Sequence, residues 1–182
     1  METTRDLIYW RTARGEFLKL DERLLLRRLA RNIAGRFNNP TIINIGVSWG
    51  ASVHCLYAGA PNTNIVGIDI DYLTRPVRGA EYLPINVNFI IADSARLKYD
   101  EPVHLVFVDG DHSYNGVKGD IDNWSPRVVA GGLMVFHDYN PQPKDAERLA
   151  GVKQAIDEWY NQAQGWREVD TTRSIITFRR VE

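Results

Sequence analysis

The sequence contains very little cysteine and no long apolar segment. Cys55 is the single cysteine among 182 residues, so no internal disulfide can form and no cysteine-based zinc site is available. No stretch approaches the roughly 20 apolar residues that span a bilayer, and residues 1–10 are charged and lack a long apolar run. We therefore expect a cytoplasmic protein that is neither exported nor embedded in a membrane.

The charges nearly cancel, at a formal net charge of −1, but they are unevenly distributed. Residues 1–40 hold nine Arg or Lys against five acids, and the remainder holds thirteen against eighteen. Such an imbalance can attract an anionic partner, but a solvated helix face is the favoured interpretation because five arginines punctuate one predicted helix. We expect a small-molecule substrate, no nucleic-acid partner and no membrane contact, while the basic N-terminal helices could form a homodimer contact. The arginines are Arg23, Arg27, Arg28, Arg31 and Arg36.

Short apolar segments of strand length recur after residue 40. Most are continuous rather than alternating, which is typical of parallel strands buried on both faces. Strands that alternate with helices predict an α/β fold, Rossmann-like, with a seven-stranded, mostly parallel sheet and helices on both faces. The predicted strands are 42–45, 65–68, 87–91, 103–108 and 133–136, followed by 166–169 and 174–178.

Three predicted helices follow from capping residues and apolar spacing. Asp21 can cap a helix whose apolar stripe recurs at every fourth position, Ser113 can cap a second, and a third covers about 149–163. The stripe of the first helix consists of Leu25, Leu29, Ile33 and Phe37. With 44% apolar residues, the chain has the makeup of one compact domain. We divide it into an N-terminal helical extension, 1–39, packed on the same domain, and a cofactor-binding domain, 40–182. Segment 71–86 is predicted to be an irregular loop because Pro76, Gly79 and Pro84 interrupt it.

Two glycines lie where the first predicted strand turns into a helix. Gly46 and Gly50 are four residues apart, with Val47 and Ser48 between them and Ser52 just after. Glycines let the backbone approach a ligand closely, and the N-terminus of the following helix offers free N–H groups to an anion. Alone, this spacing is weak evidence for a cofactor site.

Acidic residues at the ends of the next two strands strengthen the cofactor interpretation. Asp69, followed by Ile70, ends the second strand about 20 residues after the glycines, where an acid accepts hydrogen bonds from ribose hydroxyls. Asp93 and Ser94 end the third strand, where side chains reach the edge of an adenine. Parallel sheets bind ligands at these strand ends. The alternative is that these residues merely cap turns and pack.

The cofactor is better matched by S-adenosylmethionine than by a dinucleotide. NAD sites use a G-x-G-x-x-G turn, whereas this chain has Ser48 in the place of the second glycine and the bulky Trp49 next to it. A tryptophan in the place of the pyrophosphate disfavours NAD and suits the shorter S-adenosylmethionine.

The most specific signal lies in the second half of the chain. Residues 109–114 read D-G-D-H-S-Y, and Gly131-Gly132 is followed by F-H-D-Y at 136–139. With these motifs, residues 40–180 resemble the class I S-adenosylmethionine-dependent methyltransferases, in particular the small-molecule O-methyltransferases related to macrocin O-methyltransferase and the cephalosporin-hydroxylase group. The resemblance implies methyl transfer to a hydroxyl group.

The resemblance also implies roles for individual residues. Asp109, His137 and Asp138 would bind a divalent metal such as magnesium or manganese, and Asp111 or His112 would be the general base. Because His137 replaces a carboxylate and magnesium prefers oxygen, manganese, zinc, iron or no metal stay open. Asn44 stands where relatives have an acid, which bears on the contacts to the methionine amine. The cofactor would be bound by Gly46, Val47, Ser48, Gly50, Ser52, Asp69, Ile70, Asp93, Ser94 and Asp109.

Structural roles are the alternatives for the histidines and for Asp111. His112 could donate to a carbonyl beside the helix that Ser113 caps, Asp111 could interact with the dipole of that helix, and His137 could be an ordinary histidine at a strand end. We therefore predict an O-methyltransferase for a small hydroxylated metabolite, such as a sugar. A non-catalytic binding module with the same fold and a metal-dependent hydrolase built from Asp109, Asp111, His112 and Asp138 are the alternative functions.

Overall fold

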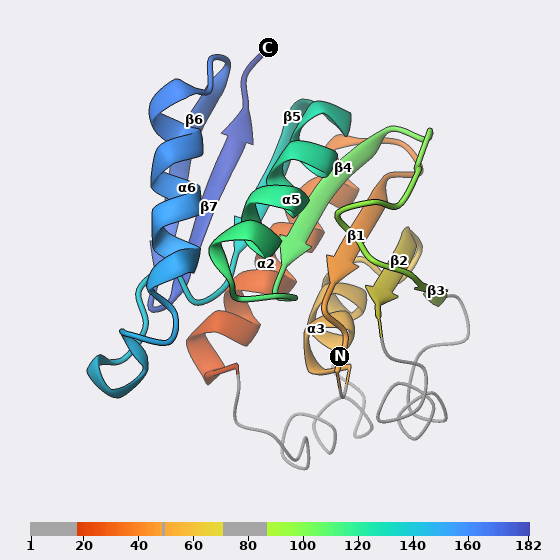
Figure 1. Ribbon diagram of the computed structural model, residues 1–182. Helices are drawn as coiled ribbons and strands as arrows, with labels where there is room; N and C mark the ends of the chain where they lie inside the picture. Colours follow the sequence, from red (N-terminus) through yellow and green to blue (C-terminus); the bar gives the residue numbers. More distant parts are fainter. Residues whose placement is uncertain (1–17, 49, 71–86) are drawn as a thin grey trace.

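The computed structural model describes residues 18–48, 50–70 and 87–182. In these residues seven strands form one sheet in the order β3-β2-β1-β4-β5-β7-β6 (Figure 1). Strands β1 to β5 run parallel to one another, whereas β7 is antiparallel to both of its neighbours. The predicted seven-stranded, mostly parallel sheet is therefore confirmed. The strands are β1 (Thr41–Ile45), β2 (Asn64–Asp69), β3 (Val87–Ile91), β4 (Val103–Val108), β5 (Val128–Phe136), β6 (Trp166–Thr172) and β7 (Ile175–Arg180).

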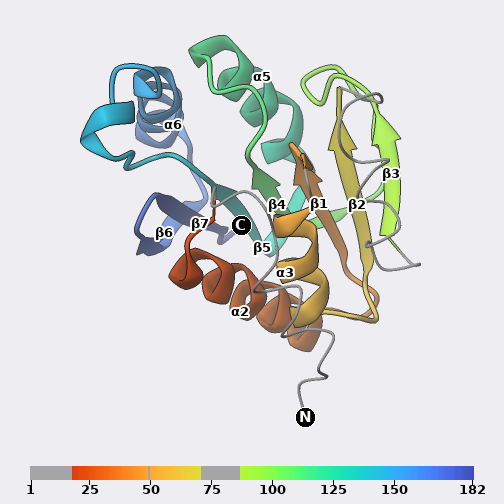
Figure 2. The same ribbon diagram turned by 90° about the horizontal axis from the view of Figure 1, so that it is seen from below.

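Helices cover both faces of this sheet (Figure 2). On one face lie α2 (Leu20–Arg36) and α3 (Ala51–Gly59), and on the other lie α5 (Tyr114–Trp124) and α6 (Ala150–Gln162). Successive side chains of a strand point to opposite faces, so Ile42 belongs to the same core as Leu26 of α2, while Ile43 belongs to the core that contains Trp124 of α5. Two short 3₁₀ segments, η2 (Ser125–Arg127) and η3 (Pro143–Asp145), flank β5 and α6. The sheet thus separates two hydrophobic cores.

Helix α2 buries three of the four residues of the predicted apolar stripe but begins earlier than predicted; the fourth, Phe37, is the half-buried C-cap. Leu25, Leu29 and Ile33 are buried. The N-cap is Lys19 rather than Asp21, because the Glu22 carboxylate accepts a hydrogen bond from the Lys19 N–H at 2.7 Å and closes the first turn. Asp21 instead lies within that turn and pairs with Arg173 at 2.7 Å. The predicted cap at Asp21 is therefore wrong.

Strand β3 corrects the expectation that the parallel strands are buried on both faces. It lies at the edge of the sheet, and Asn88, Phe89 and Ile91 are exposed. The central strands β1 and β4 meet the expectation, since β1 is buried throughout and β4 nearly so. An edge strand has a neighbour on only one side, so continuous apolar residues do not guarantee burial there.

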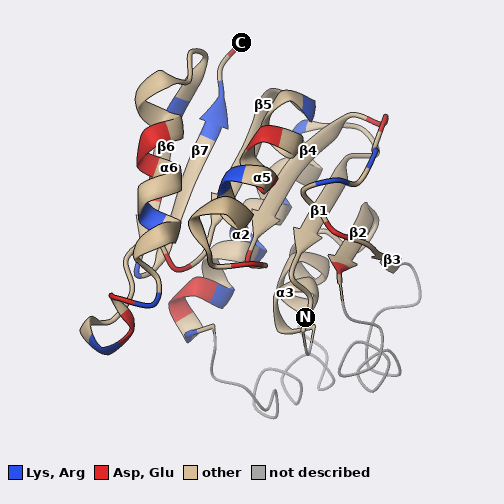
Figure 3. Cartoon of the chain, in the orientation of Figure 1, with Lys and Arg blue, Asp and Glu red and all other residues tan. Residues whose placement is uncertain are grey.

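Charged side chains lie mainly on the helices and on the loops at the strand ends (Figure 3). Acidic residues mark the carboxyl ends of β2 and β4, while β1 and β4 themselves carry no charged side chain (Figure 3). Among the described helices, none is both long enough and apolar enough to cross a membrane. The predicted loop at 71–86 and the side chain of Trp49 lie outside the described residues.

Candidate functional site

The glycine turn is packed directly against the end of β4. Gly46 has a φ of +77°, and a Cβ placed on it would lie 2.0 Å from the carbonyl oxygen of Asp109. Gly50, the N-cap of α3, also has a positive φ of 83°. Only glycine adopts such angles without strain. The turn between β1 and α3 therefore needs its glycines both for backbone angle and for contact with the neighbouring strand end.

Asp69 orders this turn from the end of β2. Its Oδ2 accepts hydrogen bonds from the N–H groups of Val47, at 2.9 Å, and Ser48, at 3.1 Å. The next residue, Ile70, is 75% exposed. The structure thus brings the predicted cofactor residues of the first two strand ends together.

Asn44 and Ser52 are buried on either side of the turn. Asn44 is fully buried, and its Nδ2 donates to the carbonyl oxygen of Gly46 at 3.1 Å. The Oδ1 atom of Asn44 is buried without a hydrogen-bond partner in the part of the chain that the structure describes. A buried acceptor of this kind normally has a partner, so the end of β1 fits a ligand that donates a hydrogen bond.

The segment after β3 is held by helix α5. The Ser94 carbonyl accepts hydrogen bonds from Asn123 Nδ2, at 2.7 Å, and Trp124 Nε1, at 3.0 Å, while Ser94 Oγ donates to Asp120 at 2.5 Å. Asp93 turns the chain by accepting from the Ala95 N–H at 3.0 Å. The sequence interpretation missed the three α5 residues, Asp120, Asn123 and Trp124, as partners of Ser94.

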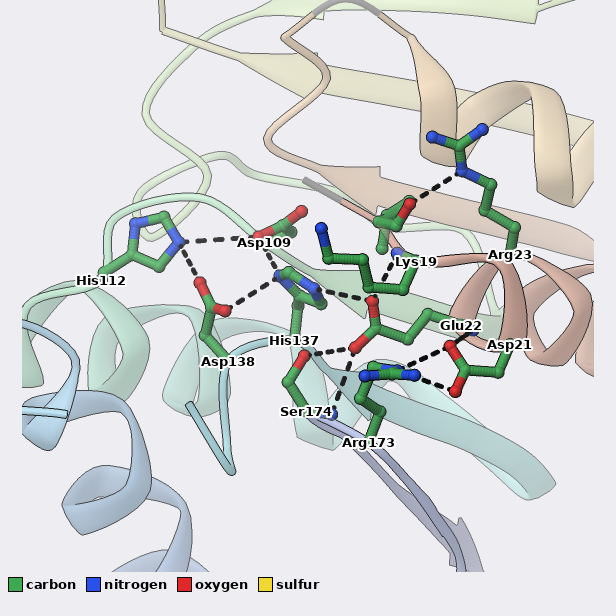
Figure 4. A network of polar contacts seen from close by, with 11 residues as sticks. Lys19, Asp21, Glu22, Arg23, Asp109, His112, His137, Asp138, Arg173 and Ser174 are labelled. Carbon is green, nitrogen blue, oxygen red and sulfur yellow. Dashed lines mark hydrogen bonds and ion pairs between the residues drawn. The ribbon is translucent and has the colours of Figure 1, made fainter. Parts of the chain in front are cut away.

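Two histidines and two aspartates form a compact cluster at the ends of β4 and β5 (Figure 4). His137 Nδ1 lies 3.0 Å from Asp109 Oδ1 and 3.4 Å from Asp138 Oδ1. His112 Nε2 lies 3.0 Å from Asp138 Oδ2 and 3.6 Å from Asp109 Oδ1. The structure therefore brings together the three predicted metal ligands and one of the two predicted bases.

A third carboxylate, missed by the sequence interpretation, reaches this cluster from α2. Glu22 is 1% exposed, and its Oε2 lies 3.8 Å from His137 Nε2 (Figure 4). Its Oε1 accepts hydrogen bonds from the backbone N–H of Ser174, at 3.1 Å, and from Ser174 Oγ, at 2.6 Å. The sequence did hold one signal for it. Glu22 lies four residues, about one helical turn, before the apolar Leu26, which places it on the buried side of the helix.

The charges of the cluster stabilise one another. Burial lowers the pKa of His137, but the charge of Asp109, the hydrogen bonds to Asp109 and Asp138 and the nearby Glu22 carboxylate outweigh burial and raise that pKa to about 12. Hydrogen bonds to Asp109 and Asp138 raise the pKa of His112 to about 9. Burial raises the pKa values of Asp109, Asp138 and Glu22, but interactions with the histidines and further hydrogen bonds outweigh burial and lower all three pKa values. The pKa of Glu22 falls to about 2. Three carboxylates thus face two imidazoles.

This donor set fits a divalent cation. Asp109, His137 and Asp138 each offer one ligand atom, and these atoms lie within 4.8 Å of one another. Even with both histidines protonated the three carboxylates leave an excess of negative charge, which favours a cation. One imidazole nitrogen beside carboxylate oxygens suits manganese, iron or zinc better than magnesium.

Asp111 is occupied with capping α5. Its Oδ1 accepts from the Ser113 N–H at 2.8 Å, its Oδ2 accepts from Ser113 Oγ at 3.0 Å, and Ser113 Oγ accepts from the Gly116 N–H at 3.0 Å. The N-cap predicted at Ser113 is confirmed. His112, by contrast, faces the acidic cluster, so the two candidate bases differ in their surroundings.

Tyr114 and Tyr139 are hydrogen-bonded to helix α6, and the single cysteine is buried. Tyr114 donates to Glu158 at 2.5 Å, and Tyr139 donates to Asp157 at 2.8 Å. Cys55 is buried in the core between α3 and the sheet, and burial raises the pKa of its thiol to about 12. A thiol in this state is a poor nucleophile at neutral pH, as expected for a structural residue.

Solved structures show the same fold. The SAH-bound methyltransferase PaMTH1 of Podospora anserina has a TM-score of 0.72 at 13% identity, with 100% of this chain and 89% of that chain covered. The O-methyltransferase NovP has a TM-score of 0.69 at 14% identity, with 90% and 81% covered. At such low identity these likenesses concern the fold.

Sequence comparison identifies the family. The uncharacterized protein R132 of Acanthamoeba polyphaga mimivirus is 25% identical over 144 residues, which cover 70% of this chain and 65% of that protein. The chain therefore matches slightly less than two thirds of this relative's length. A family model described as a methyltransferase domain matches residues 43–139, more than half of the chain. The chain therefore belongs to this methyltransferase-domain family and has the class I methyltransferase fold.

Proposed function

We propose that the chain transfers a methyl group from S-adenosylmethionine to a hydroxyl group of a small hydroxylated metabolite, with a divalent cation at Asp109, His137 and Asp138. The observation that carries the proposal is the contact between the glycine turn and the acid–histidine cluster, formed by Asp109, Asp138, Glu22, His112 and His137. A Cβ on Gly46 would meet the Asp109 carbonyl at 2.0 Å, so a ligand on the turn lies beside the cluster. The methyl donor and the hydroxyl acceptor can therefore meet at the carboxyl ends of the central strands.

The first two strand ends offer the groups that an adenosyl sulfonium needs. Asn44 Oδ1, buried and without a partner among the described residues, is a suitable acceptor for the ammonium of the methionine part. Asp69 already orders the turn through Val47 and Ser48, and its carboxylate suits the ribose hydroxyls. The PaMTH1 structure, which shares this fold, has SAH bound, and this supports the same cofactor here.

Asp93 and Ser94 suit the adenine edge from the end of β3. Asn123 and Trp124 hold the Ser94 carbonyl at 2.7 and 3.0 Å, so helix α5 fixes the backbone at this position. A fixed backbone lowers the entropy lost when a flat ring binds. This assigns α5 a supporting role in cofactor binding.

Methyl transfer needs an aligned acceptor oxygen and a place for its proton. The acceptor oxygen forms a bond to the methyl carbon as the carbon–sulfur bond breaks. The electron pair of the carbon–sulfur bond stays on sulfur, which gives S-adenosylhomocysteine. The hydroxyl proton passes to a base. A divalent cation held by Asp109, His137 and Asp138 would lower the pKa of the hydroxyl. Asp111 is bound to Ser113. His112 is the favoured base once a cation neutralises Asp109 and Asp138, the carboxylates that otherwise raise its pKa to about 9. O-methylation, rather than methylation of another atom, follows the resemblance of the motifs at 109–114 and 136–139 to O-methyltransferases; the fold is also that of the O-methyltransferase NovP.

Calorimetry with S-adenosylhomocysteine tests the cofactor site. We expect binding by the wild type and at least about tenfold weaker binding by Asp69→Asn, because the amide keeps an acceptor for the turn but loses the charge that ribose hydroxyls favour. Asp100→Asn is the control, since Asp100 is exposed in the connection that leads into the amino end of β4, whereas the site lies at the carboxyl ends of the strands. Absence of binding by the wild type would contradict the proposal. Binding without methyl transfer to a broad set of hydroxylated acceptors would instead favour the non-catalytic module.

A further inference from the structure

The side chain of His137 is held between two sets of carboxylates. Its Nδ1 faces Asp109 and Asp138, at 3.0 and 3.4 Å, and its Nε2 faces Glu22, at 3.8 Å (Figure 4). The ring is 6% exposed, and Nε2 has no hydrogen-bond partner among residues 18–48, 50–70 and 87–182. Glu22 is therefore the acid on the side of the ring that faces away from the candidate cation ligands.

Glu22 is itself fixed from three directions. Its Oε1 accepts from the Ser174 N–H and Oγ, and its Oε2 accepts from the Lys19 N–H at 2.7 Å. These partners join the start of α2 to the start of β7. A buried carboxylate with this many donors has little freedom to turn, so its Oε2 stays on the Nε2 side of His137.

We propose that Glu22 is a positioning residue for the cation site: when a cation takes the place of the proton on His137 Nδ1, the Glu22 carboxylate keeps the remaining proton on Nε2 and so leaves Nδ1 as the ligand atom. This inference rests on the cation site in the proposed function. Histidines that bind a metal through one ring nitrogen almost always direct the other at a carboxylate, a carbonyl or a water, and that partner selects the tautomer. Glu22 lies outside residues 43–139, which the family model matches, so the family motif does not include it.

A plain structural role for Glu22 makes a different prediction. If Glu22 only attached α2 to β7 through Ser174, an amide at this position would preserve that attachment, because its oxygen still accepts from the Ser174 N–H and Oγ. The amide nitrogen would then replace Oε2, lose the hydrogen bond from the Lys19 N–H and donate toward His137 Nε2. This forces the proton onto Nδ1 and removes the ligand atom.

The test is the affinity of the full chain for Mn²⁺, measured by calorimetry on wild type and Glu22→Gln. We expect about 10–100-fold weaker Mn²⁺ binding by the variant, with unchanged affinity for S-adenosylhomocysteine. Asp21→Asn is the matched control. Asp21 is the preceding residue of α2 and pairs with Arg173, beside Ser174, at 2.7 Å, so its loss perturbs the same contact between α2 and β7 while leaving Glu22 in place.

A measurement on the wild type decides the matter even if Glu22→Gln does not fold. In the Zn²⁺-loaded protein, long-range ¹H–¹⁵N spectra should show His137 with a proton on Nε2 and the metal on Nδ1. Metal on Nε2, or equal Mn²⁺ affinities of wild type and Glu22→Gln, would overturn the inference and leave the methyltransferase proposal intact. A wild type that binds S-adenosylhomocysteine but no Mn²⁺ would overturn both the cation site and this inference.

Discussion

At the scale of single residues, Asp120 is a buried acid whose charge is poorly compensated. It is 2% exposed, and the hydroxyl of Ser94 is its hydrogen-bond donor. Burial raises its pKa to about 6; the Ser94 hydrogen bond opposes this shift, and the charges of Asp93 and Asp111 add to it. The folded protein therefore favours the neutral acid, unlike the carboxylates of the acid–histidine cluster.

Stability should depend on pH through Asp120. Its folded pKa of about 6 lies above the ordinary value of 3.8, so the unfolded chain loses the proton first and its contribution to stability is lost as pH rises between these values. Relative to Asp120→Asn, the wild type should lose about 2.5 kcal/mol of unfolding free energy between pH 3.8 and about 7.

Urea unfolding across this pH range checks the prediction. Asp122→Asn serves as the control, because Asp122 lies on the same helix but is exposed and pairs with Lys118 at 2.7 Å. Its pH dependence should match the wild type. The same pH dependence in Asp120→Asn would show that Asp120 does not carry the effect.

At the scale of elements, the turn between β1 and α3 depends on the packing of β1 against β4. The backbone pairing of these strands continues into the turn, where the Asp109 N–H donates to the Ile45 carbonyl at 3.0 Å. Gly46 follows directly, with no space for a side chain against Asp109. The cofactor turn and the acidic end of β4 are therefore one structural unit.

Gly46→Ala should destabilise the protein by more than about 2 kcal/mol, because a Cβ combines a strained positive φ with overlap on backbone atoms. Gly35→Ala is the matched control. Gly35 lies in α2 with nothing within 4 Å of a Cβ, so alanine should stabilise by about 0.5–1 kcal/mol. Urea midpoints of the three proteins test this pair, and a Gly46→Ala midpoint equal to that of the wild type would refute the role of the contact.

At the scale of the whole molecule, the site collects residues from both layers of helices. Glu22 comes from α2 on one face, Ser94 is held by α5 on the other, and Asp109 and His137 come from the sheet between them (Figures 2 and 4). Because the site lies at the carboxyl ends of the strands, outside the two hydrophobic cores, loss of a cation there should leave the fold in place.

Metal removal should accordingly separate turnover from cofactor binding. After EDTA treatment we expect methyl transfer to a responsive hydroxylated acceptor to fall about 100-fold or more, since a Lewis acid supplies several kcal/mol. Affinity for S-adenosylhomocysteine should be retained, and added Mn²⁺ should restore turnover. Formation of S-adenosylhomocysteine is the measurement. Turnover that is insensitive to EDTA would contradict the role of Asp109 and Asp138 but not methyl transfer itself.

The sequence by itself determined the elements and the family. Continuous apolar segments set the central strands, the Ser113 hydroxyl set the start of α5, and the motifs at 109–114 and 136–139 pointed to a methyltransferase. These features are local, since each depends on residues within a few positions of one another. The same motifs placed Asp109, His137 and Asp138 in one predicted group, and the structure brings them together.

Only the tertiary structure decided which side chains share an environment. The order of strands placed β3 at an edge and exposed it, the packing of α2 brought Glu22 to His137, and α5 brought Asp120 to Ser94. Each of these contacts joins segments that are distant in sequence, so their distances follow from the order of the sheet and the docking of helices. No local pattern encodes them, which is why the acid beside His137 and the burial of Asp120 emerge from the fold.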